Sequence, residues 1–255
     1  MALWIVTLYY SITLPSGKLR LATIRDIPRI SIVATAGFFY SPTFAWEKRY
    51  HHQYPEDTLK SYAKRFADQI RDPGCIVLVT EDFYLPDENT KSGAIIPTTT
   101  DQEHLQAGDS VIVAVTSWQL PPESRYFGQF MDQEDLNSSD SPIFDEGLER
   151  DKDMSHSRSL HELVAAEEEK HFSHHIIIDR VVVHPAYWRR SHAKTLINWG
   201  LALAKTDSTK TGVVANPFGV GLYVSLGFVK ITTIGLRDKE EPPNEVGGVI
   251  LRYGV

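Results

Sequence analysis

The sequence has little of what marks several protein classes. Cys75 is the only cysteine among 255 residues, so an internal disulfide cannot form and a reducing compartment such as the cytoplasm is expected. Lysine and arginine total 26 against 33 aspartates and glutamates, giving a net charge of -7. That balance argues against nucleic-acid binding, which needs a dominant basic face. No long apolar run is present, so we expect no membrane partner.

The amino terminus is apolar but short. The stretch "MALWIVTLYYSITLP" lacks a basic segment before it and a clear cleavage site of small residues. We therefore treat residues 1–17 as an N-terminal extension, either an extra strand or poorly ordered. The length suits one domain, which we place at residues 18–255 with insertions at about 84–109 and 121–172.

The second insertion is strongly acidic. Residues 131–153 hold nine acidic side chains against two basic ones and few large apolar residues. Such a stretch buries too little surface to offset the entropy of ordering it, so we predict a mobile surface segment.

Hydrophobic periodicity predicts the remaining elements. Strands are expected at 18–24, 75–82, 110–120, 174–185, 211–216, 228–234 and 247–254. Helices are expected at about 25–39, 58–70, 159–172, 191–205 and 217–227, with Asp26 capping the first and Asp57 or Thr58 the second. Residues 40–58 are expected to form an aromatic-rich loop. The order predicts a mixed α/β (α+β) protein built around one sheet.

The junction "HPAYWRRSHAKTLINWG" holds two adjacent arginines where a strand ends and a helix begins. The first amide groups of a helix have no partner within it, and the helix dipole places partial positive charge there. Small residues allow close approach to the main chain. This pattern predicts a site for a polyanion.

A second pattern follows about 30 residues later. The stretch "NPFGVGLYVSLGF" spaces Asn216, Gly219, Tyr223, Gly227 and Phe228 in the pattern N-x-x-A-x-x-x-Y-x-x-x-G-F, with glycine at the alanine position. With the preceding junction, this sequence resembles the GNAT superfamily of N-acetyltransferases, in particular fungal GNAT-domain proteins of unknown acceptor. The resemblance runs from about residue 18 to the C-terminus. Trp188 and Ser191 depart from the family's phosphate-binding motif, in which glutamine or arginine and glycine are usual.

The resemblance implies a GNAT fold, with a mixed, mostly antiparallel sheet that is splayed at the cofactor site and flanked by helices. It implies acetyl-CoA as co-substrate and no metal. The residues that it assigns to cofactor binding are Val181, Val182, Val183, Arg189, Arg190, Ser191, His192, Ala193, Lys194, Asn216, Gly219 and Tyr223. Tyr223 also takes the position that protonates the departing thiolate, which suits a hydroxyl with a pKa near 10.

A general base is harder to select from the sequence. Asp179 and His175 lie on one face of the strand that precedes the polyanion site, and either side chain can accept a proton from an amine. Asp179 has an alternative interpretation as the partner of a nearby arginine. Many members of the family have no dedicated base.

The resemblance places the acceptor beside the first two helices. Aromatic side chains there are expected to form its walls: Phe39, Tyr40, Phe44, Trp46 and Trp118. The expected activity is acetyl transfer to a primary amine of a small molecule or peptide by direct attack in a ternary complex. The alternative is a weak or inactive protein that binds coenzyme A or a partner. Either a monomer or a dimer is compatible with the sequence.

Overall fold

The computed structural model describes residues 18–97, 104–131, 149–238 and 245–254. The predictions for residues 1–17, and for most of the acidic stretch, lie outside these ranges. Among the described residues, no helix is long and apolar enough to cross a membrane.

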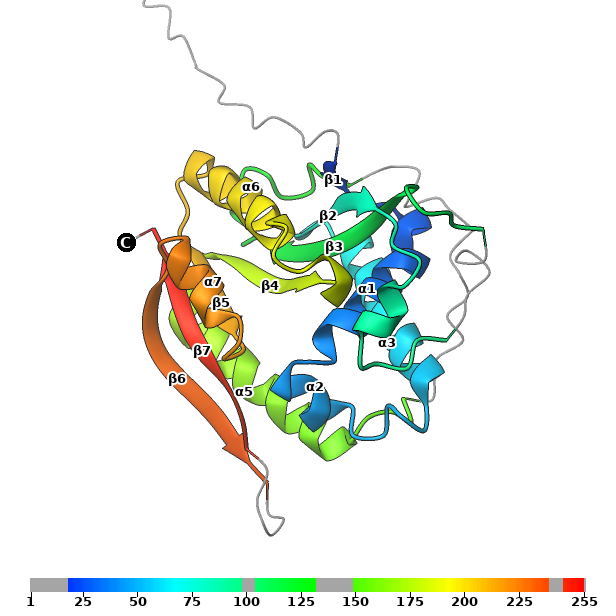
Figure 1. Ribbon diagram of the computed structural model, residues 1–255. Helices are drawn as coiled ribbons and strands as arrows, with labels where there is room; N and C mark the ends of the chain where they lie inside the picture. Colours follow the sequence, from blue (N-terminus) through cyan, green and yellow to red (C-terminus); the bar gives the residue numbers. More distant parts are fainter. Residues whose placement is uncertain (1–17, 98–103, 132–148, 239–244, 255) are drawn as a thin grey trace, which may run out of the picture.

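One sheet organises the described chain (Figure 1). Its strand order is β1-β2-β3-β4-β5-β7-β6, and β4 and β5 are parallel while the other neighbours are antiparallel. The strands are β1 Leu19–Leu21, β2 Cys75–Phe83, β3 Ser110–Gln119, β4 Ile176–Val183, β5 Thr211–Ala215, β6 Val229–Arg237 and β7 Glu245–Tyr253. The expected mixed, mostly antiparallel sheet flanked by helices is confirmed.

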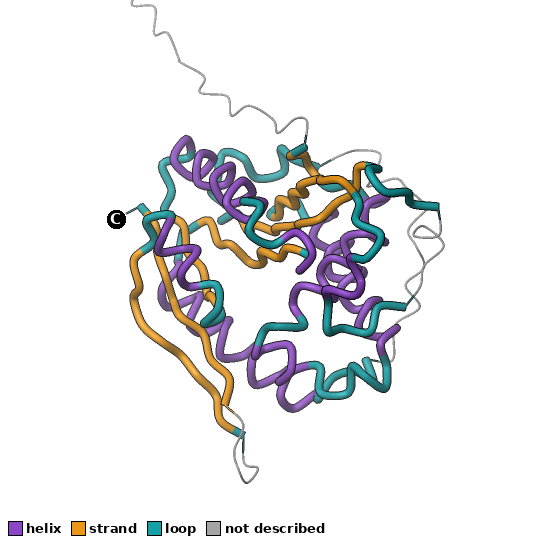
Figure 2. The backbone as a smooth tube through the Cα atoms, in the orientation of Figure 1, coloured by secondary structure: helices purple, strands orange, loops and turns teal. Residues whose placement is uncertain are grey.

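Helices cover both faces of this sheet. They are α1 Ile27–Phe38, α2 Pro42–Glu47, α3 Pro55–Arg71, α5 Met154–Phe172, α6 His192–Thr206 and α7 Val220–Ser225, and the short 3-10 turns are η1 Ile24–Asp26, η2 Glu88–Lys91 and η4 Pro185–Tyr187. Figure 2 shows these helices around the strands. Helices α1 and α3 share one hydrophobic cluster with β2 and β3, whereas α6 and α7 share another with the central strands.

The sheet opens between β4 and β5. These two strands pair only from Ile176 with Thr211 to Ile178 with Val213, after which no further partners are found in the described chain. On its other side β4 has one extra residue, because Trp118 pairs with Ile178 and Ser117 pairs with Arg180. This β-bulge at Asp179 bends the strand just where it leaves β5. The splay expected from the sequence is therefore present.

Three predictions about the elements are wrong, and the third concerns the start of α3. The segment expected to be a loop between the first two helices contains α2, whose six residues are too few to show helical periodicity. The acidic segment was expected to stay at the surface, yet Asp151, near its end, is 0% exposed. Its carboxylate accepts hydrogen bonds from Lys48 Nζ at 2.6 Å and from Thr58 Oγ1 at 2.8 Å.

Contacts with the start of α3 fix the end of the acidic segment in place. The helix begins at Pro55 rather than Thr58, so Asp57 and Thr58 lie inside its first turn instead of capping it. Asp57 accepts hydrogen bonds from the Arg150 guanidinium at 2.8 and 3.0 Å. Together with Asp151, this pair fixes the chain immediately before α5, which lies beside α2 (Figures 1 and 2).

Candidate functional site

The N-terminus of α6 is open to a ligand. Ser191 is its N-cap residue, with a φ of 70° and no side-chain hydrogen bond to the helix. The amides of His192, Ala193 and Lys194 belong to the first turn, where a helix supplies no acceptor. Ser191 and these three residues all line one cavity. The sequence pattern therefore places a set of N–H donors at a cavity wall.

The cations of this region differ in whether they form ion pairs. Arg189 and Lys194 line the cavity and, within the described residues, neither is within ion-pair distance of a carboxylate. Arg190 does not line it; its Nη1 lies 3.0 Å from the Asp82 carboxylate on β2. Asp82 also lies 3.2 Å from His192 Nε2. The sequence did not reveal this role of Asp82, which holds the helix start against β2.

The exposed edge of β4 faces the same cavity. The His184 amide donates to the Val113 carbonyl, and antiparallel pairing alternates, so the polar groups of Val181 and Val183 point away from β3. Trp188 Nε1 donates to the Val183 carbonyl at 2.8 Å. The indole therefore covers one of these groups, while no strand pairs with Val181 on this side in the described chain. This contact gives the unexpected tryptophan a structural role.

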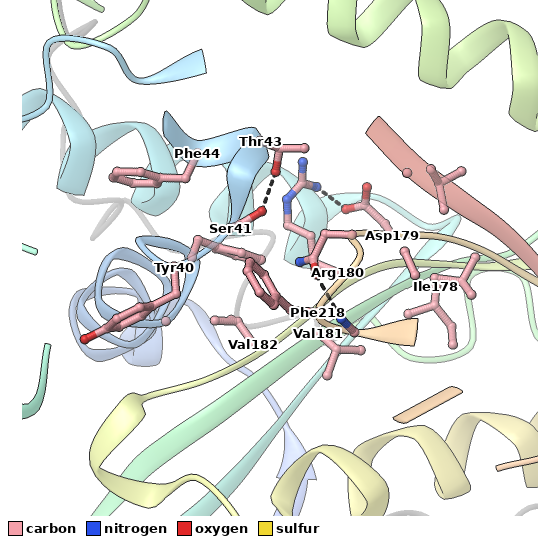
Figure 3. A pocket seen from close by; sticks show the side chains of 18 of the residues that line it. Tyr40, Ser41, Thr43, Phe44, Ile178, Asp179, Arg180, Val181, Val182 and Phe218 are labelled. Atoms are coloured by element: carbon pink, nitrogen blue, oxygen red, sulfur yellow. Dashed lines mark hydrogen bonds and ion pairs between the residues drawn. The ribbon is translucent and has the colours of Figure 1, made fainter. Parts of the chain in front are cut away.

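The cavity has a volume of about 1180 Å³ and joins most of the residues selected from sequence. From those groups it is lined by Tyr40, Phe44, Asp179, Val181, Val182, Val183, Arg189, Ser191, His192, Ala193, Lys194, Asn216, Gly219 and Tyr223. Figure 3 shows part of its lining, including the Asp179–Arg180 pair. The selected residues outside the lining are Phe39, Trp46, Trp118, His175 and Arg190. Residues far apart in sequence thus share a single cavity.

Tyr223 is held by α7 at the cavity wall. Its ring packs against Phe228 with centroids 5.3 Å apart, and only 6% of the residue is exposed. Burial raises the pKa of Tyr223 above its usual value, so the hydroxyl stays protonated at neutral pH. The turn before the helix is fixed by Asn216, whose Oδ1 accepts a hydrogen bond from the Gly219 amide at 2.9 Å.

Asp179 is surrounded by donors. Gln69 Nε2 lies 2.6 Å and Ser117 Oγ 3.0 Å from its Oδ2, and Arg180 is ion-paired to the same atom. Burial alone raises the pKa of this carboxyl, but the charges of Arg180 and Arg65 and the hydrogen bonds overcome that effect and lower it. A carboxylate with a lowered pKa is a weak base.

His175 lies before β4, outside the cavity lining. Its Nδ1 is 2.8 Å from the Ser173 carbonyl and its ring packs near Phe172. Burial lowers the pKa of His175. Its surroundings are those of a packed histidine at a strand end.

Only some of the aromatic residues predicted for the acceptor site line the cavity. Tyr40 and Phe44 line the cavity, whereas Trp46 stacks on His156 with ring centroids 4.0 Å apart. Trp118 is 1% exposed and lies against Gly200 of α6. Phe218, which the sequence analysis did not select, lines the cavity and is 78% exposed (Figure 3). Its place in the sequence, just before the helix that carries Tyr223, is the feature that could have indicated a cavity residue.

Ser191 offers a direct test of the helix start. A residue other than glycine at positive φ is strained, but this strain is the same with and without ligand, so only the loss of the Cβ should change binding. We expect Ser191→Gly to let a phosphate approach the helix amides more closely and to tighten coenzyme A binding by about fivefold, or about 1 kcal/mol. Isothermal titration calorimetry measures the Kd.

Ser208 provides the matched control because it also has positive φ, 56°, but follows α6 outside the cavity lining. Ser208→Gly should leave the Kd for coenzyme A unchanged. An equal change in both variants, or none in Ser191→Gly, would contradict this account of the helix start.

Comparison with known proteins agrees with this geometry. The model of the Acetyltransferase (GNAT) family matches residues 147–228. An acetyltransferase of Stachybotrys chartarum is 30% identical over 230 residues, covering 88% of this chain and 86% of that protein. A crystal structure from Corynebacterium glutamicum, described as histone acetyltransferase HPA2 and related acetyltransferase, has 17% identity and a TM-score of 0.52, covering 92% of this chain and 94% of that one. The chain therefore belongs to the GNAT family of acetyltransferases, as the resemblance of its motifs predicted.

Proposed function

We propose that the protein transfers the acetyl group of acetyl-CoA to a primary amine of a small molecule or peptide. One observation carries the proposal: a single cavity joins the open start of α6, the free edge of β4 and the hydroxyl-bearing residue Tyr223. Each of these features meets a different part of a thioester carrier. The reducing, cytoplasmic location remains our prediction from the single cysteine.

The chain's residues fit the carrier's charged end. Backbone donors at Ser191 to Lys194 suit a diphosphate, and the free cations Arg189 and Lys194 add charge-assisted contacts. The Val181 edge of β4 suits the amides of the pantetheine arm, in the manner of an added strand. Ser191 and Trp188 adjust this site, the first by its Cβ and the second by covering the Val183 carbonyl.

The residues at the splay supply the chemistry. Acetyl-CoA supplies an activated acyl group. Beyond Ile178 the edge of β4 has no partner on β5 in the described chain, and its amide groups on that side can stabilise negative charge that develops on the acyl oxygen. The protonated Tyr223 hydroxyl stabilises the leaving sulfur by donating a hydrogen bond and then its proton.

Direct attack of the amine on the thioester is favoured by the position of the only cysteine. Cys75 does not line the cavity, and burial raises the pKa of its thiol to about 12. A thiol with such a pKa carries almost no thiolate at neutral pH. We therefore propose a ternary complex without an acyl-cysteine. Tyr40, Phe44 and Phe218 give the amine's remaining part apolar contacts.

Three measurements test the proposal. Isothermal titration calorimetry with coenzyme A is expected to show binding, and release of free thiol from acetyl-CoA is expected with a subset of a panel of aliphatic, aromatic and peptidyl primary amines. Mass spectrometry of the product should show a gain of one acetyl group on nitrogen. Coenzyme A binding with no thiol release from any amine would favour the alternative, a binding protein without turnover.

A further inference from the structure

We propose that Glu168 on α5 is the general base that takes a proton from the acceptor amine. The inference rests on the proposed function, because it assigns the group that makes an ammonium ion nucleophilic. Primary amines are mostly protonated at neutral pH and have no free lone pair in that form. A base inside the cavity is therefore required unless the bound amine loses its proton to water.

Glu168 is placed to act on a molecule in the cavity. It is half-buried and lines the same cavity as Tyr223 and Ser191. In the described part of the chain its carboxyl makes neither a hydrogen bond nor an ion pair. By contrast, the adjacent Glu167 lies 3.2 Å from His171 Nε2 and 3.4 Å from Lys170 Nζ. Of the two carboxyls, Glu168 is the one left available to a ligand.

The surroundings of Glu168 match the requirement for a base. Burial is the largest influence and raises the pKa of Glu168, the nearby negative charge of Asp179 raises it further, and Arg180 opposes both, giving a value of about 7. The carboxylate is thus a much stronger base than an exposed one and is still largely ionised slightly above neutrality. Asp179 is the bulged residue and Arg180 follows it, just where β4 leaves β5, so the Glu168 carboxyl lies near the splay.

Other charged groups face the same cavity from neighbouring elements. They are Glu47 at the end of α2, Lys48 just after it, Arg65 from α3, Lys152 from the segment before α5, His161 from α5 itself, Arg189 before α6, and His192 and Lys194 from α6. None of these is among the charges that set the pKa of Glu168, which are Asp179 and Arg180 of β4. After burial, the pair on β4 is therefore the main influence on its protonation.

The competing bases are less suitable. Asp179 has three donors on one oxygen, as described above. Glu47 accepts a hydrogen bond from Ser157 Oγ at 3.0 Å, and although burial opposes the change, the charges of Lys48 and Lys152 lower its pKa. His161 lies 3.5 Å from the Arg65 guanidinium, and burial is the main cause of its lowered pKa. Each of these groups already has a partner that weakens it as a base.

The proton balance is complete. Glu168 accepts one proton from the ammonium ion and passes it to solvent. The amine nitrogen then forms a bond to the acyl carbon, and the carbon–sulfur bond breaks. A second nitrogen-bound proton passes to solvent, while the sulfur receives one from Tyr223, which takes a proton from solvent in turn. The net reaction converts an ammonium ion and a thioester into an amide, a thiol and one free proton.

A titration tests the carboxyl without requiring turnover. In protein labelled with ¹³C at the glutamate side-chain carboxyl, one carbon resonance should titrate with a midpoint near 7. It should be missing in Glu168→Gln and present in Glu169→Gln, a control at the adjacent exposed position. Absence of a resonance with a near-neutral midpoint, or its persistence in Glu168→Gln, would overturn the inference.

The pH dependence of the reaction tests the role itself. With the panel amine that gives the fastest thiol release, log kcat/KM should rise with pH through a midpoint near 7 in the wild type and in Glu169→Gln. Glu168→Gln should lose this limb and about 10²-fold in kcat, with an unchanged Kd for coenzyme A and an unchanged Tm. Glu168→Asp should restore part of the activity.

The possible failures are distinguishable. A wild type that releases no thiol with any amine refutes the proposed function and the base together. An active wild type with an equally active Glu168→Gln variant refutes the base alone. Loss of the limb in His161→Asn but not in Glu168→Gln would move the role to His161 and also overturn the inference.

Discussion

Replacing Tyr223 by phenylalanine should lower kcat about 100-fold while the Kd for coenzyme A stays within about twofold of the wild type. Tyr223 lines the cavity, and the substitution removes only its hydroxyl while it keeps the ring that packs against Phe228. The loss therefore falls on stabilisation of the leaving sulfur and not on the phosphate site at α6. Thiol-release kinetics and calorimetry with coenzyme A separate the two effects.

Tyr253 is the matched control. Its ring packs on the same Phe228, with centroids 5.4 Å apart, but it does not line the cavity. Tyr253→Phe should leave kcat unchanged. Full activity in Tyr223→Phe would remove this hydroxyl from the mechanism, whereas equal losses in both variants would point to a packing effect around Phe228.

The second large effect concerns stability. Lys48 and Asp151 form an ion pair 2.6 Å long, with side chains only 3% and 0% exposed. Burial lowers the pKa of Lys48 and Asp151 opposes the change, so removing the carboxylate leaves a buried ammonium without its counter-charge. We expect Asp151→Asn and Lys48→Met each to reduce the free energy of unfolding by about 3–5 kcal/mol. Denaturant unfolding measures this difference.

A double-mutant cycle isolates the pair. Lys48→Met combined with Asp151→Asn should cost far less than the sum of the two single changes, because no unpaired charge remains buried. The exposed pair Lys64–Asp68, 3.0 Å long, serves as control, and Lys64→Met should change stability by less than about 0.5 kcal/mol. Strict additivity of the buried substitutions would contradict the account.

The residues that line the cavity could be predicted from the sequence where they belong to a short local pattern. The helix start at Ser191 and the spacing from Asn216 to Phe228 are short-range signals, and the structure brings both to one cavity. Strands and helices with clear hydrophobic periodicity were also predicted, because an element that buries one face must repeat apolar residues on that face. The six residues of α2 were missed since they span fewer than two turns.

Charged residues were the main source of error. Asp151 stands in a strongly acidic stretch and was predicted to lie at the surface, and Glu168, in the run "EEEK", was not selected as a candidate site residue. Asp151 is buried because Lys48 and Thr58, more than 90 residues earlier, supply its donors. Asp82 orders the start of α6 in the same long-range way. These pairings join residues far apart in the sequence, so no local pattern could predict them.

The sequence by itself determined the family, the sheet with its flanking helices and the open helix start at Ser191, since these depend on hydrophobic period, on local residue pattern and on motif spacing. Only the tertiary structure decided which ionisable groups meet the cavity and how strongly each holds its proton. Asp179 and Glu168 have nearly the same chemistry in isolation, yet three donors lower the pKa of one while burial and a neighbouring negative charge raise that of the other. Solvation and charge pairing are properties of the folded chain, because the groups that provide them are distant in sequence.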